Sequence, residues 1–330
     1  MIITRTPFRI SFFGGGTDYP TWFRDHGGSV LATTIDKYCY ISLRHLPPFF
    51  EHKHRIVYSK IENVKSNQEI QHPAVRAVFD WAKVTDGIEI HHDGDLPARS
   101  GLGSSSSFTV GLINALSSLT GHMLSKEQLA KNAIHIEQNI IKENVGSQDQ
   151  VSAAFGGFNR IDFFKNNSFA VSPIILPEGK LEELQNHLML FFTGFSRIAS
   201  EIAESKIANF KNREVELKKM QEMVNEAVNL LQSKSPIEGF GKLLNEGWKL
   251  KRTLSERVST SEIDQIYKTS IDAGAEGGKI LGAGGGGFLL VFAKPEYQKK
   301  IREALSKLIS VPFKFEDSGS RVVLYQPNGL

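Results

Sequence analysis

The sequence predicts an α+β fold in two domains, and three observations lead to this expectation. Strand-like and helical segments alternate without the regular spacing of βαβ units, which favours α+β over a doubly wound sheet. The 330 residues exceed what one compact core usually contains. The hydrophobic pattern relaxes around residues 173–179, so we expect an N-terminal domain over 1–180 and a C-terminal domain over 181–330.

Runs rich in Phe, Ile and Tyr predict the strands of the first domain. The predicted strands cover residues 6–13, 33–43, 87–91 and 158–164. Apolar residues at helical spacing predict a helix over 108–119. Ser125 and Gln128 have the spacing of a capping box, which predicts the start of a second helix that runs to about Lys142. Residues 145–157 are expected to form a glycine-rich turn.

The second domain is expected to contain more helix. The predicted strands cover residues 188–192, 288–293 and 321–325. The predicted helices cover residues 211–231, 261–274 and 297–308. The first of these helices is amphipathic, and its charged face is most simply a solvated surface.

The composition is that of an ordinary globular protein and excludes several classes. The formal net charge of +3 is too small to argue for binding to nucleic acid or a membrane surface. The single cysteine, Cys39, cannot form a disulfide within the chain and lies in a strand-like run. The N-terminus has no apolar signal core, and no segment approaches the roughly 20 apolar residues of a membrane-spanning helix. We therefore expect a cytoplasmic enzyme.

The most informative segment is the serine-rich loop, Leu-Pro-Ala-Arg-Ser-Gly-Leu-Gly-Ser-Ser-Ser-Ser, over residues 96–107. Gly101 and Gly103 allow a tight turn that feeds a helix N-terminus, where free N–H groups and the helix dipole attract an anion. A nucleotide triphosphate fits this pattern, and a serine-rich helix cap is the simpler alternative. The loop is not a common P-loop, because no lysine follows Gly103.

Two carboxylates downstream of this loop are candidates for the chemistry. Glu137 is flanked by apolar residues at helical spacing, and Mg²⁺ would compensate its burial with a hydroxyl such as that of Ser105 as a second ligand. The alternative is a boundary glutamate that reaches solvent. Asp149 lies in a polar segment and could accept or orient an alcohol proton. Local hydrogen bonding is the alternative for Asp149.

Glycine-rich turns at both ends of the chain complete the candidate site. Near the N-terminus, Thr17 and Asp18 could hold sugar hydroxyls, and Arg9 could stabilise Asp149 in its ionised form. An Asx-turn and a surface arginine are the alternatives there. Residues 277–292 contain four consecutive glycines and match G-x-G-x-x-G, but a strand follows where a dinucleotide fold needs a helix. A rigid turn packed against the phosphate loop or the substrate explains these glycines better.

Together these segments resemble the superfamily of galacto-, homoserine, mevalonate and phosphomevalonate kinases. The family's three signatures recur in order at residues 6–18, 97–107 and 278–287. The resemblance implies a ribosomal protein S5 domain 2-like N-terminal domain that binds ATP and a ferredoxin-like C-terminal domain. It also implies Mg²⁺ on Ser105 and Glu137, a catalytic Asp149 and an assisting Arg9.

Within this superfamily the chain is most similar to D-glycero-D-manno-heptose 7-phosphate kinases. The shared segments are G-G-G-T-D at the N-terminus, G-x-Q-D-Q…G-G-F-N-x-I, T-G-x-S-R, and G-G-K-x-x-G-A-G-G-G-G-F. Galactokinases have Glu-His where this chain has Gly15 and Gly16, which argues against galactose and for a roomier pocket. The resemblance thus implies phosphorylation of the anomeric hydroxyl to give a 1,7-bisphosphate, toward nucleotide-activated heptose.

The expected ligands are ATP, Mg²⁺ and the sugar phosphate, and the oligomeric state stays open. The residues expected at ATP are Pro97, Ser100, Gly101, Leu102, Gly103, Ser104, Ser105 and Ser106. The residues expected at the sugar phosphate are Gly15, Gly16, Thr17, Asp18, Lys37, Gln148, Arg197, Gly284 and Gly285, with Lys37 and Arg197 as cations for the 7-phosphate. The alternatives are an anomeric kinase for an unphosphorylated sugar such as fucose and a catalytically silent sugar sensor.

Overall fold

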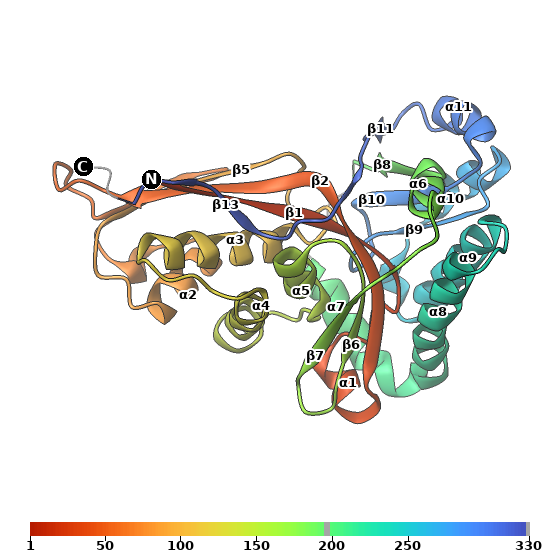
Figure 1. Cartoon of the computed structure of the whole chain (residues 1–330), viewed down its shortest axis with the longest axis horizontal. Coiled ribbons are helices and arrows are strands. Elements are labelled where there is room, and N and C mark those ends of the chain that lie inside the picture. The colour runs from red at the N-terminus through yellow and green to blue at the C-terminus, as the bar shows by residue number, and fades with distance from the viewer. Residues whose placement is uncertain (195–198, 328–330) are drawn as a thin grey trace.

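The computed structural model describes residues 1–194 and 199–327 and contains two sheets (Figure 1). The nine-stranded sheet has the path β13-β1-β2-β5-β3-β4, with β12 and β6 on β2 and β7 on β6. The four-stranded sheet has the order β11-β8-β10-β9. The strands of the larger sheet are β1 (Ile2–Phe13), β2 (Gly28–His45), β3 (His54–Val57), β4 (Ile61–Val64), β5 (Ile88–Gly94), β6 (Phe158–Phe163), β7 (Phe169–Pro173), β12 (Phe315–Glu316) and β13 (Arg321–Tyr325). Those of the smaller sheet are β8 (Leu188–Phe192), β9 (Gly277–Ile280), β10 (Phe288–Phe292) and β11 (Ile309–Ser310).

The antiparallel pair of β1 and β2 forms the backbone of the larger sheet. β1 is buried along nearly its whole length, because its Phe and Ile side chains face both a helical layer and elements of the second half. Its register with β2 shifts between Pro7 and Phe8 and again between Ser11 and Phe13. Such irregularities re-aim side chains along a strand, and Arg9 lies between these two shifts.

Helices cover one face of the larger sheet (Figure 1). The central helix α3 packs on β1 and β2 and is flanked by α4 and α5. Helices of the first half are α1 (Pro20–His26), α2 (Pro73–Trp81), α3 (Ser104–Leu119), α4 (Lys126–His135) and α5 (Gln148–Phe155). A short 3₁₀ turn spans Asn67–Glu69, and a π-helical segment, Ile136–Ile141, continues α4.

The helices of the second half pack on the smaller sheet and on the start of the chain. α9 contacts β9, and α8 packs on α9 and also on β1 and β2. These helices are α6 (Lys180–Asn186), α7 (Ala199–Asn209), α8 (Glu214–Gln232), α9 (Glu238–Thr253), α10 (Ser261–Asp272) and α11 (Pro295–Ala304), with 3₁₀ turns at Phe210–Arg213 and Glu256–Val258.

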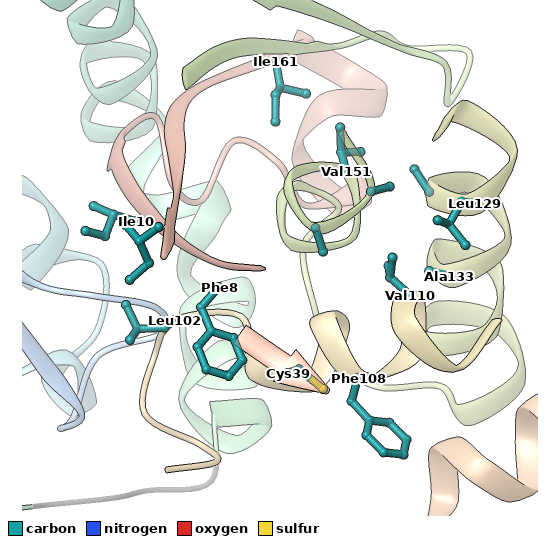
Figure 2. Packing of buried hydrophobic residues seen from close by; sticks show 14 of the residues in the cluster. Phe8, Ile10, Cys39, Leu102, Phe108, Val110, Leu129, Ala133, Val151 and Ile161 are labelled. Carbon is teal, nitrogen blue, oxygen red and sulfur yellow. The ribbon is translucent and has the colours of Figure 1, made fainter. Parts of the chain in front are cut away.

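The main core lies between the larger sheet and its helices (Figure 2). Side chains from β1 and β2 meet those of the serine-rich loop, α3, α4, α5 and β6. The labelled members are Phe8, Ile10, Cys39, Leu102, Phe108, Val110, Leu129, Ala133, Val151 and Ile161. Cys39 is 1% exposed, as expected for a strand residue of this sheet. The core therefore anchors both the serine-rich loop and the strand that carries Arg9.

The structure corrects one predicted element and complicates the predicted domain division. The turn expected over 145–157 is wrong, because α5 occupies most of it and buries Val151, Ala153 and Ala154 against the core. Beyond the smaller sheet, the chain returns to the larger one, since β12 pairs with β2 and β13 with β1. The last segment of the predicted C-terminal domain thus completes the sheet of the predicted N-terminal domain.

Candidate active site

A cavity of about 270 Å³ opens where the two halves of the chain meet. Its walls come from the serine-rich loop, the N-terminal glycine turn, the start of α5, and helices α7 and α9 of the second half. The residues that sequence motifs single out at opposite ends of the chain are therefore brought to one place.

The serine-rich loop presents the N-terminus of a 16-residue helix to this cavity. Gly103 is the N-cap of α3 and adopts a left-handed conformation with φ of 75°. No side chain caps the helix, so none of the serines serves as its cap. The first N–H groups of α3 and the positive end of its dipole remain available for an anion.

The glycine-rich turn of the second half packs directly against this loop. A Cβ on Gly101 would lie 2.5 Å from the carbonyl oxygen of Leu281, and one on Gly287 would lie 2.2 Å from that of Ser100. The N–H of Phe288 donates to the same Ser100 oxygen at 3.0 Å. These glycines therefore allow two backbones to touch, which agrees with the expectation of a rigid turn packed against the phosphate loop.

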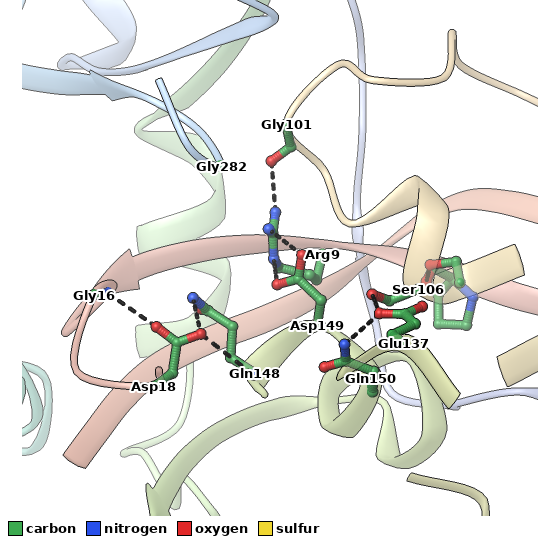
Figure 3. Close-up of polar contacts among 12 residues, drawn as sticks. Arg9, Gly16, Asp18, Gly101, Ser106, Glu137, Gln148, Asp149, Gln150 and Gly282 are labelled. Carbon is green, nitrogen blue, oxygen red and sulfur yellow. Dashed lines mark hydrogen bonds and ion pairs between the residues drawn. The ribbon is translucent and has the colours of Figure 1, made fainter. Parts of the chain in front are cut away.

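Arg9 and Asp149 form a bidentate ion pair at the wall of the cavity (Figure 3). Arg9 Nε donates to Asp149 Oδ1 and Nη2 donates to Oδ2, both at 2.8 Å. The third guanidinium nitrogen, Nη1, donates to the Gly101 carbonyl at 2.6 Å. Arg9 is 3% exposed, whereas a quarter of the Asp149 side chain remains accessible. The pair thus fixes one carboxylate beside the serine-rich loop with an open side toward the cavity.

Asp18 lies deeper in the same cavity and is held by the chain around it (Figure 3). Its carboxylate accepts from the Gly16 N–H at 2.9 Å and from the Gln148 side-chain amide at 3.0 Å. Burial raises the pKa of Asp18 above its ordinary range, and the nearby Asp149 adds to the shift. The motif residues Asp18 and Gln148, which are 130 positions apart, therefore form one hydrogen-bonded unit.

Glu137 is buried in the π-helical turn after α4, next to Ser106 of the serine-rich loop. The predicted capping box of Ser125 and Gln128 is present at the start of this helix. Glu137 Oε2 accepts from Ser106 Oγ at 2.9 Å and also from the Gln150 amide, as Figure 3 shows. Burial raises the pKa of Glu137 to about 7. The alternative of a solvent-reaching glutamate is therefore wrong, since Glu137 is 1% exposed.

The surroundings of Glu137 fit a divalent cation. Its Oε1 atom is buried and has no hydrogen-bond partner in the described part of the chain. A free carboxylate oxygen on a residue bonded to the Ser106 hydroxyl provides oxygen donors of the kind that Mg²⁺ takes. Ser105 is exposed on the cavity lining, while Ser106 is the serine bonded to Glu137. Within the described residues there is no cluster of three or more His, Cys, Asp or Glu, so any cation here would rely on hydroxyls, water or phosphate.

Several predicted ligand residues do not line the cavity. Thr17 is buried and donates to the Gly14 and Ser29 carbonyls, so it fixes the turn. Lys37 donates to Asp36. Gly285 bonds to the Val258 carbonyl, and Gly284 packs on the same residue.

The remaining predicted positions fall into two groups. Those that line the cavity are Gly15, Gly16, Asp18, Gln148, Gly101, Gly103, Ser104, Ser105, Ser106, Arg9 and Asp149. Pro97, Ser100 and Leu102 shape the loop without lining the cavity. Arg197 lies outside the described residues.

Three lysines of the cavity wall were not assigned to the site from the sequence. They are Lys206 of α7, Lys251 of α9 and Lys279 of β9. Each is at most 6% exposed. Lys251 follows Leu244 and Trp248 at helical spacing, so a lysine on the apolar face was the signal available for it.

Comparisons with known proteins agree with this geometry. A model of the GHMP kinases N terminal domain matches residues 69–157, and a model of the GHMP kinases C terminal domain matches residues 226–310. D-glycero-alpha-D-manno-heptose 7-phosphate kinase of Campylobacter jejuni is 32% identical over 317 residues, 93% of each chain. The chain belongs to the GHMP kinase family. The expected kinase fold and enzyme class are confirmed. The protein is a phosphotransferase with an alcohol group as acceptor. Sugar kinases of this family use ATP as the phosphate donor.

Further relatives of this GHMP kinase include sugar kinases and mevalonate kinases. Galactokinase of Pyrococcus furiosus is 27% identical, with 92% of each chain covered. A crystal structure of a D-glycero-D-manno-heptose 1-phosphate kinase from Bacteroides thetaiotaomicron superposes with a TM-score of 0.80 over 98% of each chain, at 23% identity, and so supports the fold. Among the described residues, no helix is long and apolar enough to cross a membrane.

Proposed function

We propose that this kinase transfers the γ-phosphate of ATP to the anomeric hydroxyl of D-glycero-D-manno-heptose 7-phosphate, giving the 1,7-bisphosphate. The observation that carries the proposal is the 32% identity to the Campylobacter jejuni heptose 7-phosphate kinase over 93% of both chains. The pair of glycines Gly15 and Gly16 on the cavity wall supports it further, because residues without side chains leave room for a large acceptor.

We assign the cavity a donor side at the start of α3 and an acceptor side at Asp18 and Gln148. The free N–H groups at the start of α3 would hold the phosphates of ATP. Glu137, with Ser105 or Ser106, would hold Mg²⁺, which neutralises charge on the phosphates when it is bound. Asp18 and Gln148 would hold sugar hydroxyls on the opposite wall.

Asp149 lies between these two sides and would receive the hydroxyl proton. Arg9 occupies one edge of its carboxylate and sets its direction, so the accessible side can accept a hydrogen bond from the acceptor. Arg9 also binds the Gly101 carbonyl, and this contact fixes the carboxylate relative to the phosphate loop. Orientation of this kind is the main contribution a protein makes to phosphoryl transfer.

Release of ADP with Mg·ATP and a panel of acceptors tests the proposal. The panel contains heptose 7-phosphate, free heptose, mannose, fucose, galactose and mevalonate. We expect strong turnover with heptose 7-phosphate and a 1,7-bisphosphate product by ³¹P NMR. Preferred turnover of fucose would move the function to an unphosphorylated sugar, and binding of ATP without turnover of any acceptor would favour a sensor.

A further inference from the structure

The lining of the cavity carries more positive than negative side chains. The basic residues are Arg9, Arg99, Lys206, Lys251 and Lys279. The acidic residues are Asp18, Glu143 and Asp149. Arg9 is neutralised by Asp149, and Arg99 interacts with Glu143 near the serine-rich loop. Three lysines thus remain around Asp18, on the acceptor side of the cavity.

Two of these three lysines have structural partners. Lys251 Nζ donates to the carbonyls of Ile280 and Gly282, at 2.8 and 2.6 Å. Lys279 Nζ donates to the Phe12 carbonyl at 2.7 Å. Their ammonium groups therefore hold the glycine-rich turn and the end of β1.

Lys206 differs from both of them. Its side chain is 4% exposed and lines the cavity, yet its ammonium has no hydrogen-bond partner within residues 1–194 and 199–327. The ammonium lies 5.6 Å from the centre of the Tyr19 ring. A buried ammonium with three unused donors is costly unless a ligand completes its coordination.

The charges around Lys206 indicate what kind of ligand this is. Burial lowers the pKa of Lys206 to about 8, and Asp18 and Asp149 partly oppose the shift. Burial is the main cause that lowers the pKa of Lys251 and of Lys279, and the charge of Lys206 lowers both further, so the lysines repel one another. A group with two negative charges would relieve this repulsion, whereas a neutral sugar hydroxyl would not. The ammonium faces the ring of Tyr19, the residue next to Asp18, and therefore lies on the acceptor side.

We propose that Lys206 binds the phosphate group that the acceptor already carries and thereby selects phosphorylated sugars over free ones. This inference rests on the proposed function in taking the acceptor to be a sugar that already carries a phosphate group. An ammonium is suited to this role, because it is a compact charge with three donors that can follow a rotating phosphate.

The test compares Lys206→Met with the wild type on a matched pair of acceptors, heptose 7-phosphate and free heptose. We expect kcat/KM for the phosphorylated acceptor to fall about 10- to 100-fold, mainly through KM, as for the loss of one charged hydrogen bond. The value for free heptose should change less than threefold. Lys206→Arg should retain most of the preference, and Lys219→Met, at an exposed position on α8, should behave as the wild type.

The outcomes separate this inference from the proposed function. Equal losses for both acceptors would overturn the inference, because Lys206 would then serve the transferred phosphoryl group. An unchanged preference would also overturn it. If the wild type rejects heptose 7-phosphate, the same comparison is made by calorimetric binding of mannose 6-phosphate and mannose. A preference for the phosphate that Lys206→Met removes would then support Lys206 while refuting the proposed acceptor, and no preference in the wild type would overturn the inference.

Discussion

Replacement of Asp149 by Asn tests the centre of the proposed site with a minimal change in shape. The amide keeps one oxygen that can accept from Arg9, but its NH₂ group faces a second guanidinium donor. One of the two 2.8 Å charged hydrogen bonds is therefore lost. Such a bond contributes about 1.5–3 kcal/mol. Because Asp149 is a quarter accessible, solvent reduces this loss, and we expect the free energy of unfolding to fall by about 1–2 kcal/mol.

The effect on turnover should be much larger than the effect on stability. Loss of a group that accepts or orients the reacting proton lowers kcat by about 10²–10⁴-fold. ADP release measures this value, urea unfolding measures stability, and calorimetry with a non-hydrolysable ATP analogue measures donor binding. Donor affinity should stay within about threefold of the wild type, since the α3 N-terminus is unchanged.

Asp162→Asn is a matched control for this substitution. Asp162 pairs with Arg160 at 2.9 Å and has a similar exposure, but it does not line the cavity. This control should lose a comparable amount of stability and keep its turnover. A kcat for Asp149→Asn above one tenth of the wild-type value would refute a catalytic role for Asp149.

Two further predictions concern the elements that hold the site in place. Burial raises the pKa of Glu137 from 4.5 to about 7, so its charge destabilises the fold progressively as pH rises between these values, by about 3 kcal/mol in full. In urea unfolding without divalent cations, the stability of Glu137→Gln relative to the wild type should therefore increase from pH 5 to pH 8. An equal stability difference at both pH values would contradict the burial of this charge. Gly287→Ala places a Cβ 2.2 Å from the Ser100 carbonyl oxygen at a φ of +90°, so the free energy of unfolding should fall by at least about 2 kcal/mol. Gly121→Ala is the control, because Gly121 has a φ of +77° but no neighbour within 4 Å, and it should lower the free energy of unfolding by about 1 kcal/mol.

Several elements with strong periodicity could be read from the sequence with nearly correct bounds, although the amphipathic helix α9 was missed. The strands over 188–192 and 321–325 and the amphipathic helix α8 are examples. The helix α5 was missed because it is only eight residues long and is bracketed by glycines and polar residues, which are typical of turns. The pairing of β13 with β1 was also out of reach, since no local pattern specifies which edge a returning strand joins.

Some residues of the candidate site could likewise be predicted from the sequence, and others could not. Arg9, Asp18 and Asp149 could be predicted because each lies in a short, unusual motif, and the structure brings all three to one cavity. Lys206 and Lys251 have no such motif around them, and their place at the cavity depends on how α7 and α9 pack. Lys279 lies within the motif G-G-K-x-x-G-A-G-G-G-G-F, but only the glycines of that motif were assigned to the site. Lys206 is recognisable only once Asp18, nearly 190 residues earlier, is seen to influence its charge.

The contacts between the two halves explain why the phosphate loop needs both of them. Gly101 and Leu281 approach so closely that neither loop could hold its path if the other moved. Lys251 extends this link to α9 through the carbonyls on either side of Leu281. Because Arg9 binds the Gly101 carbonyl as well as Asp149, a displacement of the glycine-rich turn would reach the Asp149 carboxylate through two residues, Gly101 and Arg9. Gly287, the last of the four consecutive glycines, therefore supports the position of the serine-rich loop, and Arg9 links that loop to the Asp149 carboxylate.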